Sequence, residues 1–262
     1  MTTRDDARLF TPDERVALRD ALIDAARRDA RISGVALTGS GALDAEDRWS
    51  DVDLAFGVAA GTDRAALITE WTDRMYRAHE AVHHMDVAAG AALFRVFLLR
   101  STLQVDLAFW PEAEFGAIAP TFRLVSGTAR ERPRSPSPSA DGLVGMGWLY
   151  ALHARSSIAR GKVWQAEYMI SGVRDHVLAL ACLRHGAPAV QGRGMDSLPR
   201  ELTETFTGAL VRSLEPAELR RAFTCACELL LAEVEKVDAE LARRLKEPLL
   251  ELASASDSDE MR

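Results

Sequence analysis

A polar, proline-rich stretch divides the chain and constrains its fold more than any other feature. Residues 128–141 include the run Arg-Glu-Arg-Pro-Arg-Ser-Pro-Ser-Pro-Ser, which cannot donate a full set of backbone hydrogen bonds to a sheet. Helical and strand-like patterns alternate before this stretch, whereas nearly all of residues 142–253 has helical spacing. The length of 262 residues also exceeds the usual size of one domain. We therefore predict two domains, over residues 1–135 and 140–255.

The first domain is predicted to have a mixed α/β (α+β) fold. Thr11-Pro12-Asp13-Glu14 is a capping-box pattern with proline at the first helical position, so we expect a helix that ends near Asp29. Apolar runs predict buried strands at 32–37 and 52–58, and helical spacing predicts a second helix within 62–79. Further strands are expected at 81–88, 93–99 and 103–109. This order of elements predicts a mixed sheet, and the second half of the chain predicts an all-helical bundle.

Composition and net charge indicate which partners and which cellular compartment to expect for this chain. The formal net charge of −7 argues against a nucleic-acid partner, because such proteins neutralise phosphates with an excess of basic residues. The three cysteines cannot form a closed set of disulfides, which favours a reducing cytoplasm. The N-terminus lacks an apolar run of the length of a signal-peptide core, and no later run is long enough to span a bilayer. We expect a soluble cytoplasmic protein without a membrane partner, and the pattern predicts no particular oligomeric state.

The chemistry is concentrated around two short motifs, Gly39-Ser40 and Asp51-Val52-Asp53, which are separated by ten residues. Asp51 and Asp53 are two positions apart on a predicted strand, so both side chains point to the same side. Their mutual repulsion is best tolerated beside a divalent cation, and hard carboxylate ligands suit Mg²⁺ or Mn²⁺. Gly39-Ser40 ends a predicted strand, where backbone N–H groups and the hydroxyl can bind phosphate oxygens. A phosphate-binding turn thus precedes a predicted metal site.

Asp106 is a third candidate ligand because it interrupts an otherwise apolar predicted strand. Three carboxylates could hold two ions about 4 Å apart, an arrangement that activates an attacking oxygen and stabilises a leaving pyrophosphate. The alternative is that Asp106 only pairs with Arg95 or Arg100. Taken singly, Gly39-Ser40 would be a plain turn, and the aspartate pair would be a calcium site or a solvated strand end. The spacing of the two motifs together with Asp106 favours the metal site.

These residues resemble the nucleotidyltransferase superfamily of DNA polymerase beta. The similarity lies in a hydrophobic residue before Gly39-Ser40, about ten intervening residues, Asp51-Val52-Asp53 and an aspartate, Asp106, on a later strand. The catalytic resemblance covers residues 32–109 and is greatest to the antibiotic-modifying branch, the aminoglycoside and lincosamide nucleotidyltransferases. In that branch an α/β catalytic domain is followed by a helical bundle, and residues 160–167 are similar to the start of a bundle helix.

The resemblance implies transfer of a nucleoside monophosphate, with ATP as the preferred nucleoside triphosphate donor, to a hydroxyl of a small-molecule acceptor. Asp51 and Asp53 would bind Mg²⁺ (or Mn²⁺), and Gly39 and Ser40 would hold the triphosphate. Asp106 would complete the metal site or act as general base, and Glu167 is the other candidate base. Two alternatives remain open. One is a tRNA or protein acceptor in a toxin–antitoxin-like system, and the other is an inactive nucleotide-binding module.

Other charged and aromatic residues bear on the acceptor. The loop carboxylates Asp44, Glu46 and Asp47 are interpreted as solvated or acceptor-facing charges, which together with the acidic balance would attract a polycation such as an aminoglycoside. Trp49 and Trp164 are candidate contacts for a lincosamide, which carries a single amine. Trp164 and Glu167 lie on one helical arc that would face either the catalytic domain or solvent.

Overall fold

The computed structural model describes residues 9–133 and 137–254. The chain divides into two compact units, Met1–Ser135 and Pro136–Arg262, and each is described by itself. Residues 134–136 of the expected linker lie outside the described residues. None of the helices in the described ranges combines the length and the apolar character that a membrane crossing requires.

A mixed six-stranded sheet forms the centre of the first unit. Its strands are arranged in the order β3-β4-β5-β2-β1-β7, in which β2 and β5 pair in parallel and the other neighbours pair antiparallel. A short two-stranded sheet joins β6 and β8. The elements are α1 (Pro12–Arg28), β1 (Ile32–Thr38), η1 (Gly39–Leu43), β2 (Val52–Val58), α2 (Arg64–Ala78), β3 (Ala81–Ala89), β4 (Ala92–Leu99), β5 (Gln104–Pro111), η2 (Glu112–Glu114), β6 (Gly116–Ala117), β7 (Phe122–Gly127) and β8 (Arg130–Glu131).

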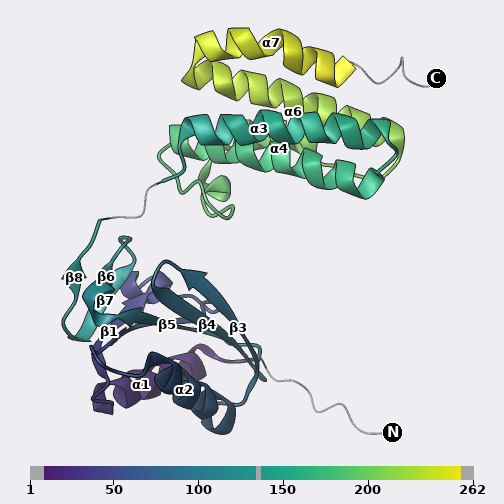
Figure 1. Cartoon of the computed structure of the whole chain (residues 1–262). Coiled ribbons are helices and arrows are strands. Elements are labelled where there is room, and N and C mark those ends of the chain that lie inside the picture. The colour runs from purple at the N-terminus through teal and green to yellow at the C-terminus, as the bar shows by residue number, and fades with distance from the viewer. Residues whose placement is uncertain (1–8, 134–136, 255–262) are drawn as a thin grey trace, which may run out of the picture. The chain divides into compact units, whose positions relative to one another are not determined.

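The two helices of this unit lie on the same side of the sheet (Figure 1). The predicted capping box starts α1: the Thr11 hydroxyl accepts a hydrogen bond from the Glu14 N–H at 3.2 Å, and the Glu14 carboxylate accepts one from the Thr11 N–H at 2.8 Å. Leu22 of α1 and Trp71 of α2 pack with Phe56 of β2 in one buried core. The mixed α/β prediction is confirmed, while β7 was not among the expected strands.

The opposite face of the sheet carries the side chains that alternate with this core. Leu54 and Phe56 point towards the helices, so Asp53 and Ala55, which alternate with them along β2, project from the other face. A smaller apolar cluster that includes Ala55 and Phe115 covers part of this face. We call the side that α1 and α2 do not cover the open face.

The second unit is all-helical, as predicted. Its helices α3 and α4 pack with α6 and α7 around a separate apolar core. A buried carboxylate, Glu233 of α6, is paired with Arg184 at 3.1 Å and with Lys236 at 2.5 Å. The elements are α3 (Ala140–Ala159), α4 (Val163–Arg184), η3 (Met195–Ser197), α5 (Arg200–Phe206), η4 (Thr207–Ala209), α6 (Pro216–Val237) and α7 (Ala239–Ser254).

Candidate metal centre and phosphate-binding turn

Three aspartates come together on the open face of the sheet. Asp51 directly precedes β2, Asp53 is near the start of β2, and Asp106 lies opposite Asp53 on the parallel strand β5. One carboxylate oxygen from each of the three lies within 4.8 Å of the others. Strand pairing therefore assembles the cluster, because residues opposite each other on neighbouring strands point to the same face.

The electrostatics of the cluster favour a cation. All three side chains are half-buried. The neutral amide of Gln104 donates hydrogen bonds to Asp106 at 3.0 Å and to Asp51 at 3.4 Å, and within the described residues neither Asp106 nor Asp51 forms a salt bridge. Burial raises the pKa of Asp106 above its usual value, the Gln104 hydrogen bond opposes this rise, and the nearby Asp51 charge adds to it. Clustered carboxylate oxygens fit Mg²⁺ or Mn²⁺, which prefer hard oxygen ligands.

Gly39 brings the chain backbone against this cluster. It is the first residue of η1, directly after β1, and has a φ of +58°, a conformation that favours glycine. A Cβ at this position would overlap Asp53 Oδ2 and lie 3.0 Å from Asp53 Cγ. Gly39 therefore allows the turn to approach the carboxylate closely, and the adjacent Ser40 is half-buried beside it.

Two arginines of α1, the buried Arg15 and the half-buried Arg19, hold the loop that leads into Asp51, a feature that no motif of the sequence indicates. The Arg15 side chain is only 4% exposed, and its guanidinium donates to the carbonyl oxygens of Asp47 and Ser50. Glu46 pairs with Arg19 at 2.6 Å and with Arg15 at 3.5 Å. The loop residues immediately before the candidate ligand are thus fixed to the helix.

Two of the three loop carboxylates, Asp44 and Asp47, are exposed, whereas Glu46 is not. Asp44 is exposed but pairs with Arg123 at 2.7 Å, and Arg123 also donates to the Gly41 carbonyl oxygen at 2.7 Å. Asp47 accepts hydrogen bonds from the Trp49 N–H at 2.8 Å and from the Ser50 hydroxyl, and these bonds lower its pKa. The interpretation of Glu46 as a solvated charge was wrong, because its side chain is only 16% exposed and is ion-paired. These groups brace the loop.

Glu167 belongs to the helical unit. It lies on α4, is half-buried, and accepts a hydrogen bond from the Ser171 hydroxyl at 2.8 Å. Trp164, one turn earlier, is 76% exposed. The structure brings Asp51, Asp53, Asp106 and the Gly39-Ser40 turn together within the first unit, and the role of Glu167 stays a prediction.

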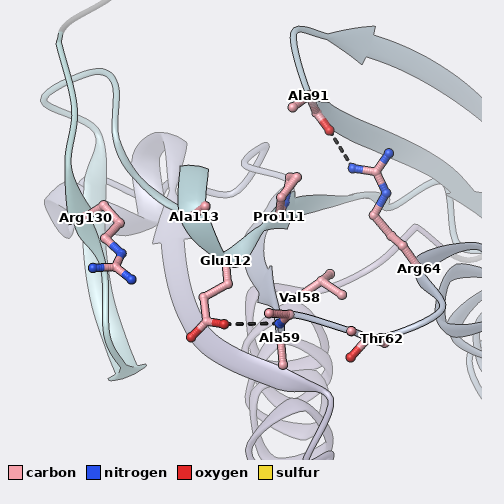
Figure 2. Close-up of a pocket in the computed structure, with 11 residues that line it drawn as sticks. Val58, Ala59, Thr62, Arg64, Ala91, Pro111, Glu112, Ala113 and Arg130 are labelled. Atoms are coloured by element: carbon pink, nitrogen blue, oxygen red, sulfur yellow. Dashed lines mark hydrogen bonds between the residues drawn. The ribbon is translucent and has the colours of Figure 1, made fainter.

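A pocket of about 550 Å³ lies at the far ends of β2 and β5, beyond Val58 and Pro111 (Figure 2). Two of the three charged side chains that line it, those of Glu112 and Arg64, are bound to the protein backbone. Glu112 accepts a hydrogen bond from the Ala60 N–H at 3.1 Å, and Arg64 donates to the Ala91 carbonyl oxygen at 2.5 Å (Figure 2). The aspartate cluster occupies the opposite ends of the same two strands, so this pocket is separate from the candidate metal centre.

Comparisons with known proteins return distant structural similarities. No protein-family model and no curated protein matches the sequence. An aminoglycoside 6-adenyltransferase from Bacillus subtilis has 14% identity and a TM-score of 0.41, with 94% of this chain and 100% of that chain covered. A nucleotidyltransferase-like protein from Exiguobacterium sibiricum has 14% identity and a TM-score of 0.35, with 89% and 80% covered.

The polymerase core of TRAMP, an RNA surveillance complex, has 14% identity and a TM-score of 0.28, with 94% of this chain and 84% of that chain covered. By description, the first two structures are an adenyltransferase and a nucleotidyltransferase-like protein, which is the group that the motif residues resemble. At this identity and with TM-scores below 0.5, the similarity assigns no activity or substrate to this chain.

Proposed function

We propose that this protein is a metal-dependent nucleotidyltransferase that transfers AMP from ATP to a hydroxyl of a small molecule and releases pyrophosphate. One observation carries the proposal: the three aspartates converge on one site directly beside the Gly39 turn. We propose Mg²⁺ as the cation, with Mn²⁺ as a substitute, and an aminoglycoside- or lincosamide-like antibiotic as the acceptor. ATP dependence and free cysteines fit work in the cytoplasm.

Each residue of the site has a part in this chemistry. Asp51 and Asp53 would hold the cation, which when bound supplies Lewis-acid stabilisation of the triphosphate and of the attacking oxygen. Backbone N–H groups at Gly39 and Ser40 would bind triphosphate oxygens. Asp106 would complete the cation site or accept the proton of the acceptor hydroxyl, and Glu167 is the other candidate base.

The alternatives are less consistent with the molecule. A tRNA acceptor would require basic surface, whereas the chain has a net charge of −7. An inactive nucleotide-binding module would not need three converging carboxylates, whose repulsion costs stability without a cation. A protein acceptor in a toxin–antitoxin-like system remains the second candidate, because nothing in the carboxylate cluster discriminates between hydroxyl acceptors.

The direct test is to replace the metal ligands. Asp51→Asn and Asp53→Asn should each abolish pyrophosphate release at saturating Mg²⁺ while the melting temperature stays equal or rises, because a repelling charge is removed. Asp73→Asn, at an exposed aspartate of α2, is the matched control and should retain activity. Turnover near that of the wild type in either ligand variant would refute the metal site.

Acceptor identity is tested in cells. The protein would be expressed in a susceptible bacterium, resistance to aminoglycosides and lincosamides measured, and nucleotidylated drug sought by mass spectrometry. If no drug gains a nucleotide while a cellular protein or tRNA becomes labelled in lysate, the small-molecule acceptor is wrong and the second candidate replaces it.

A further inference from the structure

A neutral side chain, that of Gln104, links two of the clustered aspartates. Gln104 is the first residue of β5, and its amide donates hydrogen bonds to Asp106 at 3.0 Å and to Asp51 at 3.4 Å. An amide NH₂ group carries two N–H donors, so one side chain can serve both carboxylates at once. The longer distance makes the contact with Asp51 the weaker of the two. Gln104 thus connects β5 to the segment before β2 through the cluster itself.

The sheet fixes the place from which this amide reaches the cluster. Leu103 and Val105 are buried in the core beneath the helices, so Gln104 between them projects from the open face. Gln104 also pairs with Leu98 of β4 in the antiparallel ladder. The turn between β4 and β5 is closed by a hydrogen bond of 2.9 Å from the Leu99 N–H to the Leu103 carbonyl oxygen. The backbone of Gln104 is therefore held independently of the carboxylates that its side chain contacts.

The donor is uncharged, which sets Asp51 and Asp106 apart from carboxylates of the neighbouring loop. Asp44 pairs with an arginine at 2.7 Å, and Glu46 pairs with another at 2.6 Å. A basic side chain at position 104 would also bind Asp51 and Asp106, but it would neutralise part of the charge that attracts a cation. The amide of Gln104 holds the two carboxylates and leaves their negative charge unchanged. Such a donor suits a site whose counter-charge is a bound ion.

A shared donor also changes the cost of binding a cation. Converging carboxylates repel each other, and this repulsion favours rotamers that separate them. The Gln104 amide opposes the separation of Asp51 and Asp106, whose oxygens lie within 4.8 Å of each other and of Asp53. Ligands that are already in place lose less freedom when the ion binds, so the ion binds more tightly. Groups that orient metal ligands in this way typically change metal affinity or activity by about 10- to 100-fold.

We propose that Gln104 is a positioning residue for the cation: its amide holds Asp51 and Asp106 together before the ion arrives and leaves their charge available to it. This inference rests on the proposed metal-dependent function and gives Gln104 no contact with the reacting atoms. Two consequences have opposite signs. Loss of the donor weakens cation binding, whereas a positively charged donor in the same place stabilises the fold and weakens cation binding even more.

The experiment measures cation binding by the full-length protein, so its readout does not depend on turnover. Mn²⁺ affinity would be measured by electron paramagnetic resonance, first without nucleotide and then with a non-hydrolysable ATP analogue. Melting temperatures would be measured in EDTA. The variants are Gln104→Leu, which has a similar size and no donor, and Gln104→Lys, which supplies a positively charged donor. The control is Gln165→Leu, the same substitution at an exposed glutamine of α4.

Gln104→Leu should weaken Mn²⁺ binding without nucleotide by about tenfold, and the control should leave it unchanged. Gln104→Lys should weaken Mn²⁺ binding more than Gln104→Leu does, while its melting temperature in EDTA rises above that of the wild type. If Gln104→Leu fails to fold, Gln104→Lys decides alone, because its two expected effects differ in sign.

The outcomes that overturn the proposals are distinct. A wild type that binds no Mn²⁺, with or without the ATP analogue, would refute the proposed function itself. Wild-type binding of Mn²⁺ only together with the analogue would overturn the role of Gln104, because the carboxylates would then not be arranged for a cation beforehand. Equal affinity in the wild type and the Gln104 variants would overturn it too. A fall in melting temperature alongside the loss of affinity in both variants would show that Gln104 merely supports the fold.

Discussion

Replacing Gly39 with alanine should disable the site through a single methyl group. Gly39 has a φ of +58°, and an added Cβ would overlap Asp53 Oδ2. Either the turn or the Asp53 carboxylate must then move. Since Asp53 is one of the three clustered carboxylates, its displacement removes a candidate cation ligand without altering any charge.

The expected magnitude has two parts. An alanine in a left-handed conformation costs about 1–2 kcal/mol, which corresponds to a loss of about 2–8 °C in melting temperature. Misplacing a reacting group by about 1 Å can cost about 100-fold in rate, so pyrophosphate release should fall by at least about that factor. Gly61 is a matched control, because it has a φ of +79° and no atom within 4 Å of an added Cβ. Gly61→Ala should therefore show the stability loss without the loss of activity.

Both variants would be measured by thermal unfolding with and without ATP and Mg²⁺, and by pyrophosphate release. Gly39→Ala should lose the Mg²⁺-dependent rise in melting temperature that ATP produces, whereas Gly61→Ala should keep it. If Gly39→Ala retains that rise and turns over at the rate of Gly61→Ala, the close approach of the turn to Asp53 has no part in the function.

Three further outcomes test the scaffold. Arg15→Met should lower the free energy of unfolding in urea by about 2–3 kcal/mol and reduce turnover, because charged hydrogen bonds to the loop before Asp51 are lost. The control is Arg28→Met, at an exposed arginine of the same helix, which should change neither quantity. Equal effects of the two substitutions would contradict the role of Arg15 in holding the loop. Glu233→Gln should destabilise the helical unit by about 1–2 kcal/mol in urea unfolding, because the buried side chain loses its charge-assisted hydrogen bonds to the partly exposed Arg184 and Lys236. An unchanged midpoint would show that the pairing contributes nothing. Burial raises the pKa of Cys227 to about 12. The buried thiol therefore contributes stability at any pH below the pKa of the unfolded thiol, which is about 8.5, and this contribution is lost as the pH rises towards the pKa of the folded state. Near neutral pH, N-ethylmaleimide should therefore modify the half-buried Cys225 first, and early labelling of Cys227 in a peptide map would refute its burial.

The core of the site could be predicted from sequence because its signals are local or periodic. Asp51 and Asp53 share a strand face by simple alternation, and Asp106 stood out as a charge in an apolar run. The glycine before Ser40 pointed to a turn. The attachment of the loop to α1 could not be predicted. Arg15 bonds to Asp47, 32 residues later in the chain, and Arg19 bonds to Glu46, 27 residues later. Helical spacing does not reveal such contacts between separate elements.

The fold was predicted where hydrophobic patterns are strong. The capping box, the two helices of the first unit and five of its strands have clear periodicity. β7 was missed because it is a short edge strand with half-exposed side chains, so neither an apolar run nor regular alternation marks it. β7 becomes a strand through its pairing with β1, and a single sequence does not show such a tertiary contact.

The parallel pairing of β2 with β5 also has a consequence for the order of folding events. Asp53 and Asp106 lie opposite each other in this pair, although α2 and the β3–β4 hairpin separate the two strands along the chain. Long-range pairings must overcome loop-closure entropy before they gain contacts, so they form later than hairpins. A chain that has formed its hairpins but not this pairing has only two of the three carboxylates in place. Added Mg²⁺ should consequently slow the opening of the completed sheet while leaving the earliest folding steps unchanged.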